Sequence, residues 1–98
     1  MTTKTTPFDA AATLDTAEAI EAFLEDAFES GDHGFISHAL GVVARARGMT
    51  QLAEETGLTR QTLYKALSAE GNPEFSTILK VADALGFRLI PSRARTAG

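Results

Sequence analysis

The chain of 98 residues contains no cysteine, which excludes disulfides, cysteine-based metal sites and a cysteine nucleophile. Its longest uninterrupted apolar run, residues 39–44, is far shorter than the roughly 20 residues that cross a bilayer. The N-terminus lacks the apolar core of a secretory signal. The length suits a single compact domain. We therefore expect a cytoplasmic, one-domain protein that does not associate with a membrane.

Positive charge is scarce in the first half of the chain. The net charge of the whole chain is −4. Residues 1–44 contain one basic residue and eight acids, whereas residues 45–98 contain eight basic residues and five acids. This asymmetry indicates two surfaces with different partners. The alternative is that the acids only keep one helix soluble.

Helical periodicity begins with two long segments. Apolar residues at helical spacing predict an amphipathic helix over residues 16–30, with Asp15 and Glu18 resembling a capping box. Gly31 would end this helix, and Asp32 would begin a second helix over residues 32–47, which Gly48 would close. The expected inward positions are Ile20, Phe23, Leu24, Ala27 and Phe28 in the first helix, and Ile36, Ala39, Leu40 and Val43 in the second.

The charged and polar residues near the second helix allow further readings. Arg45 and Arg47 stand at its end, where they suit the negative end of the helix dipole or a phosphate group equally well. His33 and His38 are five residues apart, so they do not share a helix face as metal ligands would. We therefore predict neither a metal site nor a cofactor.

Residues 50–68, TQLAEETGLTRQTLYKALS, have the spacing of a helix-turn-helix. Ala53 is small enough for a close crossing, Gly57 permits a sharp turn, and Thr59 can cap the second helix. Leu63 and Leu67 would face the core. The remaining side chains are hydrogen-bond donors and one tyrosine, which suit phosphate oxygens and base edges. The candidate DNA-binding residues are Thr50, Gln51, Thr59, Arg60, Gln61, Thr62, Tyr64, Lys65 and Ser68. An ordinary helical hairpin is the alternative.

A final helix is expected from Phe75 to Leu85, with Ser76 as its cap and Gly86 as its stop. Residues 87–90 are β-prone and end at a proline, so a short strand is possible. Such a strand either packs as an extended tail or pairs with the same strand of a second copy. Residues 1–14 would form an irregular lead-in, partly disordered, and residues 91–98 a flexible basic tail.

The predicted fold is an all-α, five-helix bundle over residues 15–90, with an embedded helix-turn-helix similar to phage-repressor (lambda-repressor-like) DNA-binding domains. An enzyme is disfavoured, because no phosphate-binding loop or metal-ligand spacing is present. Ser68 lacks an evident base.

The segments LDTAEAIEAFLEDAFESGD and ARGMTQLAEETGLTRQTLYKALSAEGNPEFSTILKVADALGFRL resemble the addiction-module antidote proteins, the HigA-like antitoxins with a repressor-type (XRE/Cro-like) helix-turn-helix. Phage repressors usually place a phosphate-binding glutamine three residues before the Leu-Ala pair. Here that position is Met49, while Gln51 directly precedes the pair, so Thr50 is an alternative phosphate contact. The resemblance implies a homodimer that represses its own operon by binding operator DNA.

The resemblance also implies a small basic toxin of the RelE/ParE fold as partner. The acidic half of this chain can dock on a basic surface, with complementary charge guiding association. The candidate toxin-binding residues are Phe8, Leu14, Glu21, Glu25 and Glu29. The alternatives are that the two apolar residues only cover the core, and that the protein is a stand-alone phage-type repressor without a toxin.

Overall fold

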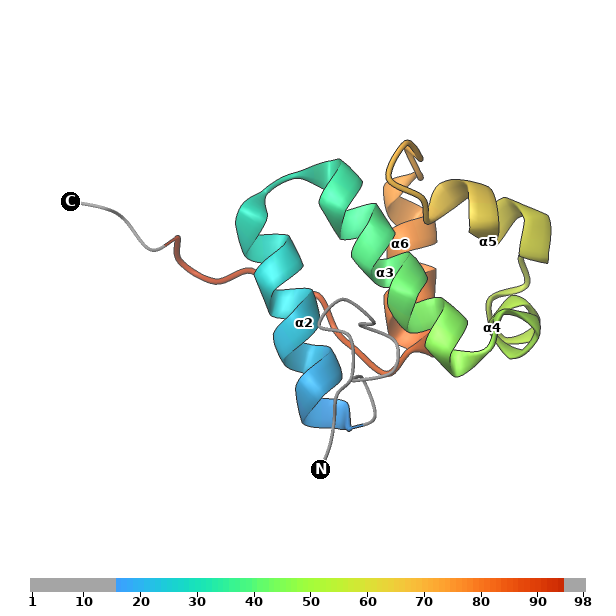
Figure 1. Cartoon of the computed structure of the whole chain (residues 1–98), viewed down its shortest axis with the longest axis horizontal. Coiled ribbons are helices and arrows are strands. Elements are labelled where there is room, and N and C mark those ends of the chain that lie inside the picture. Colours follow the sequence, from blue (N-terminus) through green and yellow to red (C-terminus); the bar gives the residue numbers. More distant parts are fainter. Residues whose placement is uncertain (1–15, 95–98) are drawn as a thin grey trace, which may run out of the picture.

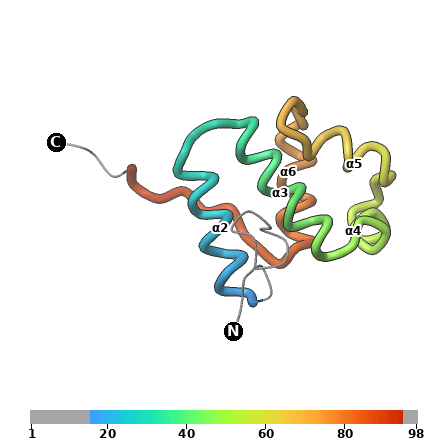
Figure 2. Tube along the Cα trace, viewed as in Figure 1, coloured from blue at the N-terminus to red at the C-terminus, as the bar shows by residue number. Residues whose placement is uncertain are grey.

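The computed structural model describes residues 16–94, which form five helices and no strand. The elements are α2 (Ala17–Ser30), α3 (His33–Arg47), α4 (Met49–Thr56), α5 (Arg60–Ala66) and α6 (Phe75–Ala84). In Figure 1, α3 crosses the middle of the molecule, with α2 on one side and α4 and α5 on the other. The continuous trace in Figure 2 shows the C-terminal segment returning from the end of α6 toward α2. The all-α prediction is confirmed over these residues.

The first two helices begin and end through local hydrogen bonds. Thr16 caps α2 by accepting a 3.0 Å hydrogen bond from the amide of Ala19. The predicted capping box is therefore one residue early, and its Asp15 lies outside the described residues. Gly31 ends α2 in the left-handed region with φ 70°, and the Asp32 side chain accepts from two amides at the start of α3. Both of these predictions are confirmed.

The core lies where α3 meets the other helices. Leu40, Leu52 and Leu63 are each at most 1% exposed, so α3, α4 and α5 share one centre. α6 adds Val81 to it, and Leu85 follows from the C-cap of α6. α2 packs mainly on α3 through Leu24 and Ala27, while Phe28 stays outside this cluster. The other buried apolar residues are Ala39, Val43, Ala44, Met49, Leu67 and Ala82.

The α4–turn–α5 unit, residues 49–67, has the two helices, the turn glycine and the cap that the sequence predicts. Gly57 ends α4 with φ 77°, a conformation that residues with a Cβ rarely adopt. The Thr56 hydroxyl accepts from the amide of Leu58 at 3.2 Å, which closes the turn. Thr59 then caps α5 by accepting from the amide of Thr62 at 3.0 Å. Leu58 packs against the core, so the turn cannot swing away from it.

Glycines on α3 allow α3 to lie close to the backbone that follows α5. A Cβ on Gly34 would stand 2.8 Å from the carbonyl oxygen of Ala69, and a Cβ on Gly41 would collide with the carbonyl oxygen of Leu67. These glycines are seven residues apart and therefore share one face of α3. Ser37, which is buried, lies between them on the same face. The close approach fixes the C-terminal end of α5 against α3.

The last helix differs from its prediction at the start. α6 begins at Phe75 with Glu74 as its N-cap, and no side chain caps it. Ser76 was expected to cap but lies inside the first turn. Gly86 ends the helix as predicted, with φ 89° and a 2.8 Å hydrogen bond from the amide of Phe87 to the carbonyl of Ala82.

The C-terminal segment, residues 87–92, is extended but forms no strand within the described chain. Phe87 packs against the core, which fits the extended-tail alternative. Ile90 remains 69% exposed. The backbone groups of Arg88, Leu89 and Ile90 make no hydrogen bond to another described residue. The edges of this extended segment therefore have no hydrogen-bond partner among the described residues.

Candidate nucleic-acid interface and acidic groove

The outer face of α5 carries five of the candidate DNA-binding residues on about two turns of helix. Arg60, Gln61 and Thr62 lie in the first turn, followed by Tyr64 and Lys65, and all five are exposed. No acid occurs in α5. The two buried residues beneath, Leu63 and Leu67, anchor the helix to the core. α5 therefore presents donors outward from a rigid base.

Arg60 is oriented by an aromatic neighbour. Its guanidinium carbon lies 6.0 Å from the centre of the Tyr64 ring, one turn further along α5. A contact of this kind contributes about 0.5–1 kcal/mol at an exposed site. It limits the rotamers of the arginine before any ligand arrives. The Thr59 hydroxyl also donates to the Thr62 hydroxyl at 2.8 Å, which orders the start of the helix.

Of the three remaining candidates that flank α5, two have hydrogen bonds within the protein. The Gln51 side-chain amide donates to Glu55 at 3.2 Å along α4, whereas Thr50 is exposed. The Ser68 hydroxyl donates to the Lys65 carbonyl at 3.1 Å, just beyond α5. These contacts do not remove the residues from a surface, but they reduce the free hydrogen-bonding groups of Gln51 and Ser68.

The two arginines at the end of α3, Arg45 and Arg47, make different contacts. Arg47 donates two hydrogen bonds, of 3.0 and 3.2 Å, to the carbonyl oxygen of Ala84. Its charge thus lies at the C-terminal end of α6, where the helix dipole is negative. The sequence predicts Arg47 at the end of α3, but it does not predict this contact with α6. Arg45 is exposed and lies over Gly41.

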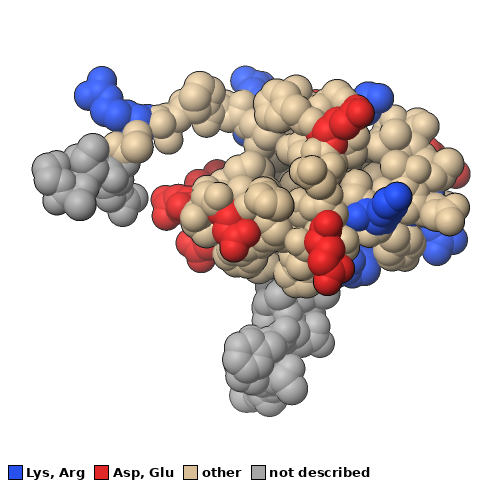
Figure 3. Space-filling view, turned by 90° about the horizontal axis from the view of Figure 1, so that it is seen from above, with Lys and Arg blue, Asp and Glu red and all other residues tan. Residues whose placement is uncertain are grey.

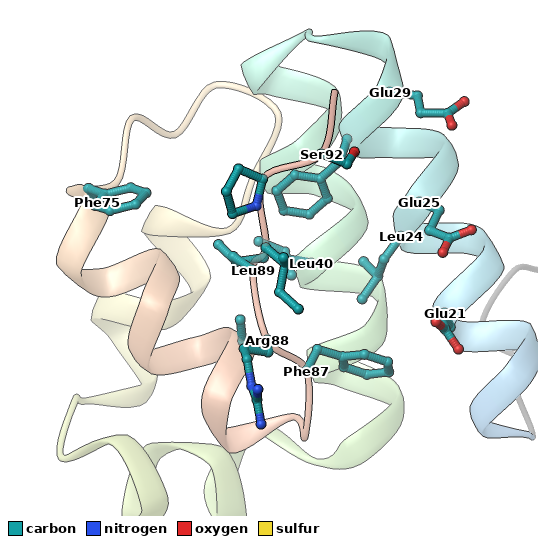
Figure 4. Close-up of a pocket in the computed structure, with 14 residues that line it drawn as sticks. Glu21, Leu24, Glu25, Glu29, Leu40, Phe75, Phe87, Arg88, Leu89 and Ser92 are labelled. Carbon is teal, nitrogen blue, oxygen red and sulfur yellow. The ribbon is translucent and has the colours of Figure 1, made fainter. Parts of the chain in front are cut away.

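An open groove of about 740 Å³ lies between α2, α6 and the C-terminal segment. Its lining residues are Glu21, Leu24, Glu25, Phe28, Glu29, Leu40, Phe75, Ala82, Phe87, Arg88, Leu89, Ile90, Pro91 and Ser92. In Figure 4 the C-terminal segment passes between α6, which carries Phe75, and α2, which carries Glu21, Glu25 and Glu29. The structure brings these three predicted glutamates together on one rim. Phe8 and Leu14 lie outside the described residues.

The two surfaces lie at opposite ends of the molecule. α2 and α5 are on opposite sides of α3 in Figure 1. Figure 3 shows acidic side chains gathered on the α2 half, while the α5 half shows Lys and Arg among isolated acids. One molecule can therefore offer both surfaces without overlap.

The described residues contain neither a metal-binding cluster nor a membrane-spanning helix. Within residues 16–94, no group of three or more histidine, cysteine or acidic side chains is arranged to hold a metal ion. No helix in the described part of the chain is long and apolar enough to cross a membrane.

These features define a small all-helical protein with an acid-free helix at one end and an acidic groove at the other. A family model described as "Probable addiction module antidote protein" matches residues 4–92, and the chain belongs to this family. It is also 40% identical over 97 residues to an uncharacterized protein of Haemophilus influenzae, covering 99% of this chain and all of that protein. No solved structure matches the chain.

The sequence pattern did not predict the groove itself. The spacing of four residues between Glu21, Glu25 and Glu29 already placed them on one helix face. What the spacing could not show is that this face borders Phe87 and the extended segment after it, because that contact joins residues about 60 positions apart.

Proposed function

We propose that this protein is the antitoxin of a type II toxin–antitoxin module. It binds and neutralises a small basic toxin of the RelE/ParE fold, and it represses its own operon by sequence-specific binding to DNA. Membership of the antidote family supports the toxin partner. The observation that carries the DNA-binding half is the exposed, acid-free face of α5 above its two buried leucines. The proposal is a HigA-like regulator with no catalytic role, acting in the cytoplasm.

In the proposed complex, the N-terminal end of α5 enters the major groove. Arg60 and Gln61 read base edges, since arginine pairs with guanine and glutamine with adenine. The Tyr64 ring lies beside the arginine before DNA binds, so less side-chain freedom is lost on binding. Lys65 and Thr50 contact phosphates.

The proposed repressor acts as a homodimer. A helix as short as α5 reads few base pairs, and two copies one DNA turn apart read two half-sites. The edge of residues 88–90 is unpaired within the described chain, which supports this assembly, because an exposed extended edge can pair with its own copy about a two-fold axis. Ile90, on this segment, and Phe75, 71% exposed on α6, would be covered in the same contact.

Fluorescence anisotropy tests the DNA-binding half. The probe is a labelled duplex covering the region upstream of this gene, compared with a shuffled duplex across a salt series. Arg60→Ala should weaken binding to the upstream duplex by about 1–3 kcal/mol and relax selectivity at one base position. Arg93→Ala, an exposed arginine on the C-terminal tail, is the matched control for the lost charge.

Several outcomes separate the possibilities. If Arg60→Ala binds the upstream duplex as the wild type does, α5 does not read DNA. If the wild type binds neither duplex, the protein is a helical interaction module without a DNA role. Specific DNA binding without any toxin partner would identify a stand-alone repressor.

A further inference from the structure

We propose that the α2 side of the groove is the toxin-docking surface, and that its occupant is a positively charged, amphipathic helix of the toxin. This side is defined by Glu21, Leu24, Glu25, Phe28 and Phe87. The inference rests on the proposed function and adds the site and chemistry of the contact. Its first support is that α2 packs mainly on α3 among the described helices, so its flank facing the groove is not covered by another of them.

The groove combines an apolar floor with a charged rim. Leu24 and Phe87 point toward each other across its base in Figure 4, and Phe28 lies outside the core cluster. The rim carries three glutamates against a single cation, Arg88. Apolar anchors surrounded by charges are the arrangement that gives a protein interface both affinity and orientation.

The spacing of the rim favours a helix as occupant. Glu21 and Glu25 stand one helical turn apart, and the row to Glu29 extends about 12 Å at 1.5 Å per residue. An apposed helix with lysine or arginine every four residues presents cations at the same interval while its apolar face enters the groove. Glu29 already has an interaction of its own, so the argument depends on the other two glutamates.

Other occupants fit less well. Nucleic acid is repelled, because its phosphates would meet the glutamate row. In a two-fold contact through the α2 side, a second copy would bring its own glutamate row against this one, with Arg88 as the one cation among the lining residues. A toxin helix on α2 leaves α5 free, since α2 lies across α3 from α5 (Figure 1).

The test compares two charge reversals on the same helix. Glu21→Lys with Glu25→Lys alters the groove rim, whereas Glu18→Lys with Asp26→Lys makes the same change in charge at exposed α2 positions that do not line the groove. The probe is the protein encoded by the reading frame adjoining this gene, made with its nuclease site inactivated. Stopped-flow association is measured at 0.15 M salt, where exposed charges beyond about 8 Å are screened.

The rim reversal should slow association about tenfold or more, and the control reversal less than threefold. A second pair tests the apolar floor: Phe28→Gln should speed dissociation about tenfold, while Phe35→Gln, on an exposed phenylalanine of α3 outside the groove, should not. Circular dichroism melts show whether each variant is folded, and if Phe28→Gln unfolds, the charge pair alone decides.

Each result has one meaning. Equal effects of the two reversals, or no effect of either, overturn the groove as the docking site while the toxin partner stands. A wild-type protein that does not bind the probe overturns the toxin half of the proposed function, and the groove proposal with it. Self-association of the wild type that the rim reversal abolishes would assign the groove to a second copy.

Discussion

Replacing Gly41 with alanine should destabilise the fold, although alanine is the better helix former. The added methyl group would collide with the carbonyl oxygen of Leu67, with the carbonyl carbon behind it at 3.3 Å. Both are backbone atoms, so no rotamer change relieves the contact. To restore ordinary carbon–oxygen separation, α3 and the end of α5 must move apart by on the order of 1 Å.

The magnitude follows from two opposing terms. Overpacking of a tight contact costs about 1–3 kcal/mol, and the rigid backbone places Gly41→Ala near the upper value. Replacing glycine by alanine inside a helix returns about 1 kcal/mol. The net loss should be about 2 kcal/mol, which for a domain of this size lowers the melting temperature by about 8–16 °C.

Urea and thermal unfolding followed by circular dichroism measure this difference. Ala46→Gly, at an exposed position of the same helix, calibrates the propensity term and should cost about 1 kcal/mol. If Gly41→Ala is as stable as the wild type, or more stable, the close approach of α3 to the end of α5 is wrong. The variant should also bind the upstream duplex less tightly, because α5 shifts relative to the rest of the fold.

Three further predictions concern single side chains. Lys65→Ala should weaken binding to all DNA sequences alike and reduce the slope of log affinity against log salt by about one unit; an unchanged slope would remove Lys65 from the phosphate contacts. Arg47→Met should lower the free energy of unfolding by about 1 kcal/mol through loss of its hydrogen bonds to Ala84, whereas Arg45→Met should change it little in the same urea titration. Ile90→Asp should convert a dimer to a monomer in sedimentation velocity while Ala94→Asp does not, and a wild type that is monomeric at all concentrations would refute the dimer.

Local signals predicted the helices well. Gly31, Gly57 and Gly86 end helices where the sequence placed them, because each adopts a positive φ that other residues avoid. Asp32 and Thr59 cap as expected through side-chain oxygens close to free amides. These rules depend only on residues within one turn of each other.

The wrong or undecided predictions lie where these local rules do not choose between alternatives. Asp15 and Thr16 are adjacent capping residues, and no local rule decides between them. Ser76 can cap only if the helix begins after it, but Phe75 is already helical. The β-prone residues 87–90 lack a neighbouring strand in the described chain, so their propensity produces an extended segment and nothing more.

The candidate surfaces also contain some features that the sequence predicts and others that it does not. The exposed face of α5 could be predicted, because a four-residue spacing of buried leucines leaves the rest of a short helix outside. The close contacts of Gly34 and Gly41, and the bonds from Arg47 to α6, join parts of the chain that are far apart in sequence. No periodicity encodes such contacts, and only the assembled fold reveals them.

α5 has seven residues, about half of what an isolated helix needs to persist in water. Its order comes from Leu63 and Leu67 in the core and from the α3 backbone beside Gly41. The outer face of α5 therefore exists only in molecules whose whole domain is folded. A variant with a lower free energy of unfolding therefore loses binding-competent molecules in step with the fraction that unfolds. No partly folded form retains the outer face of α5.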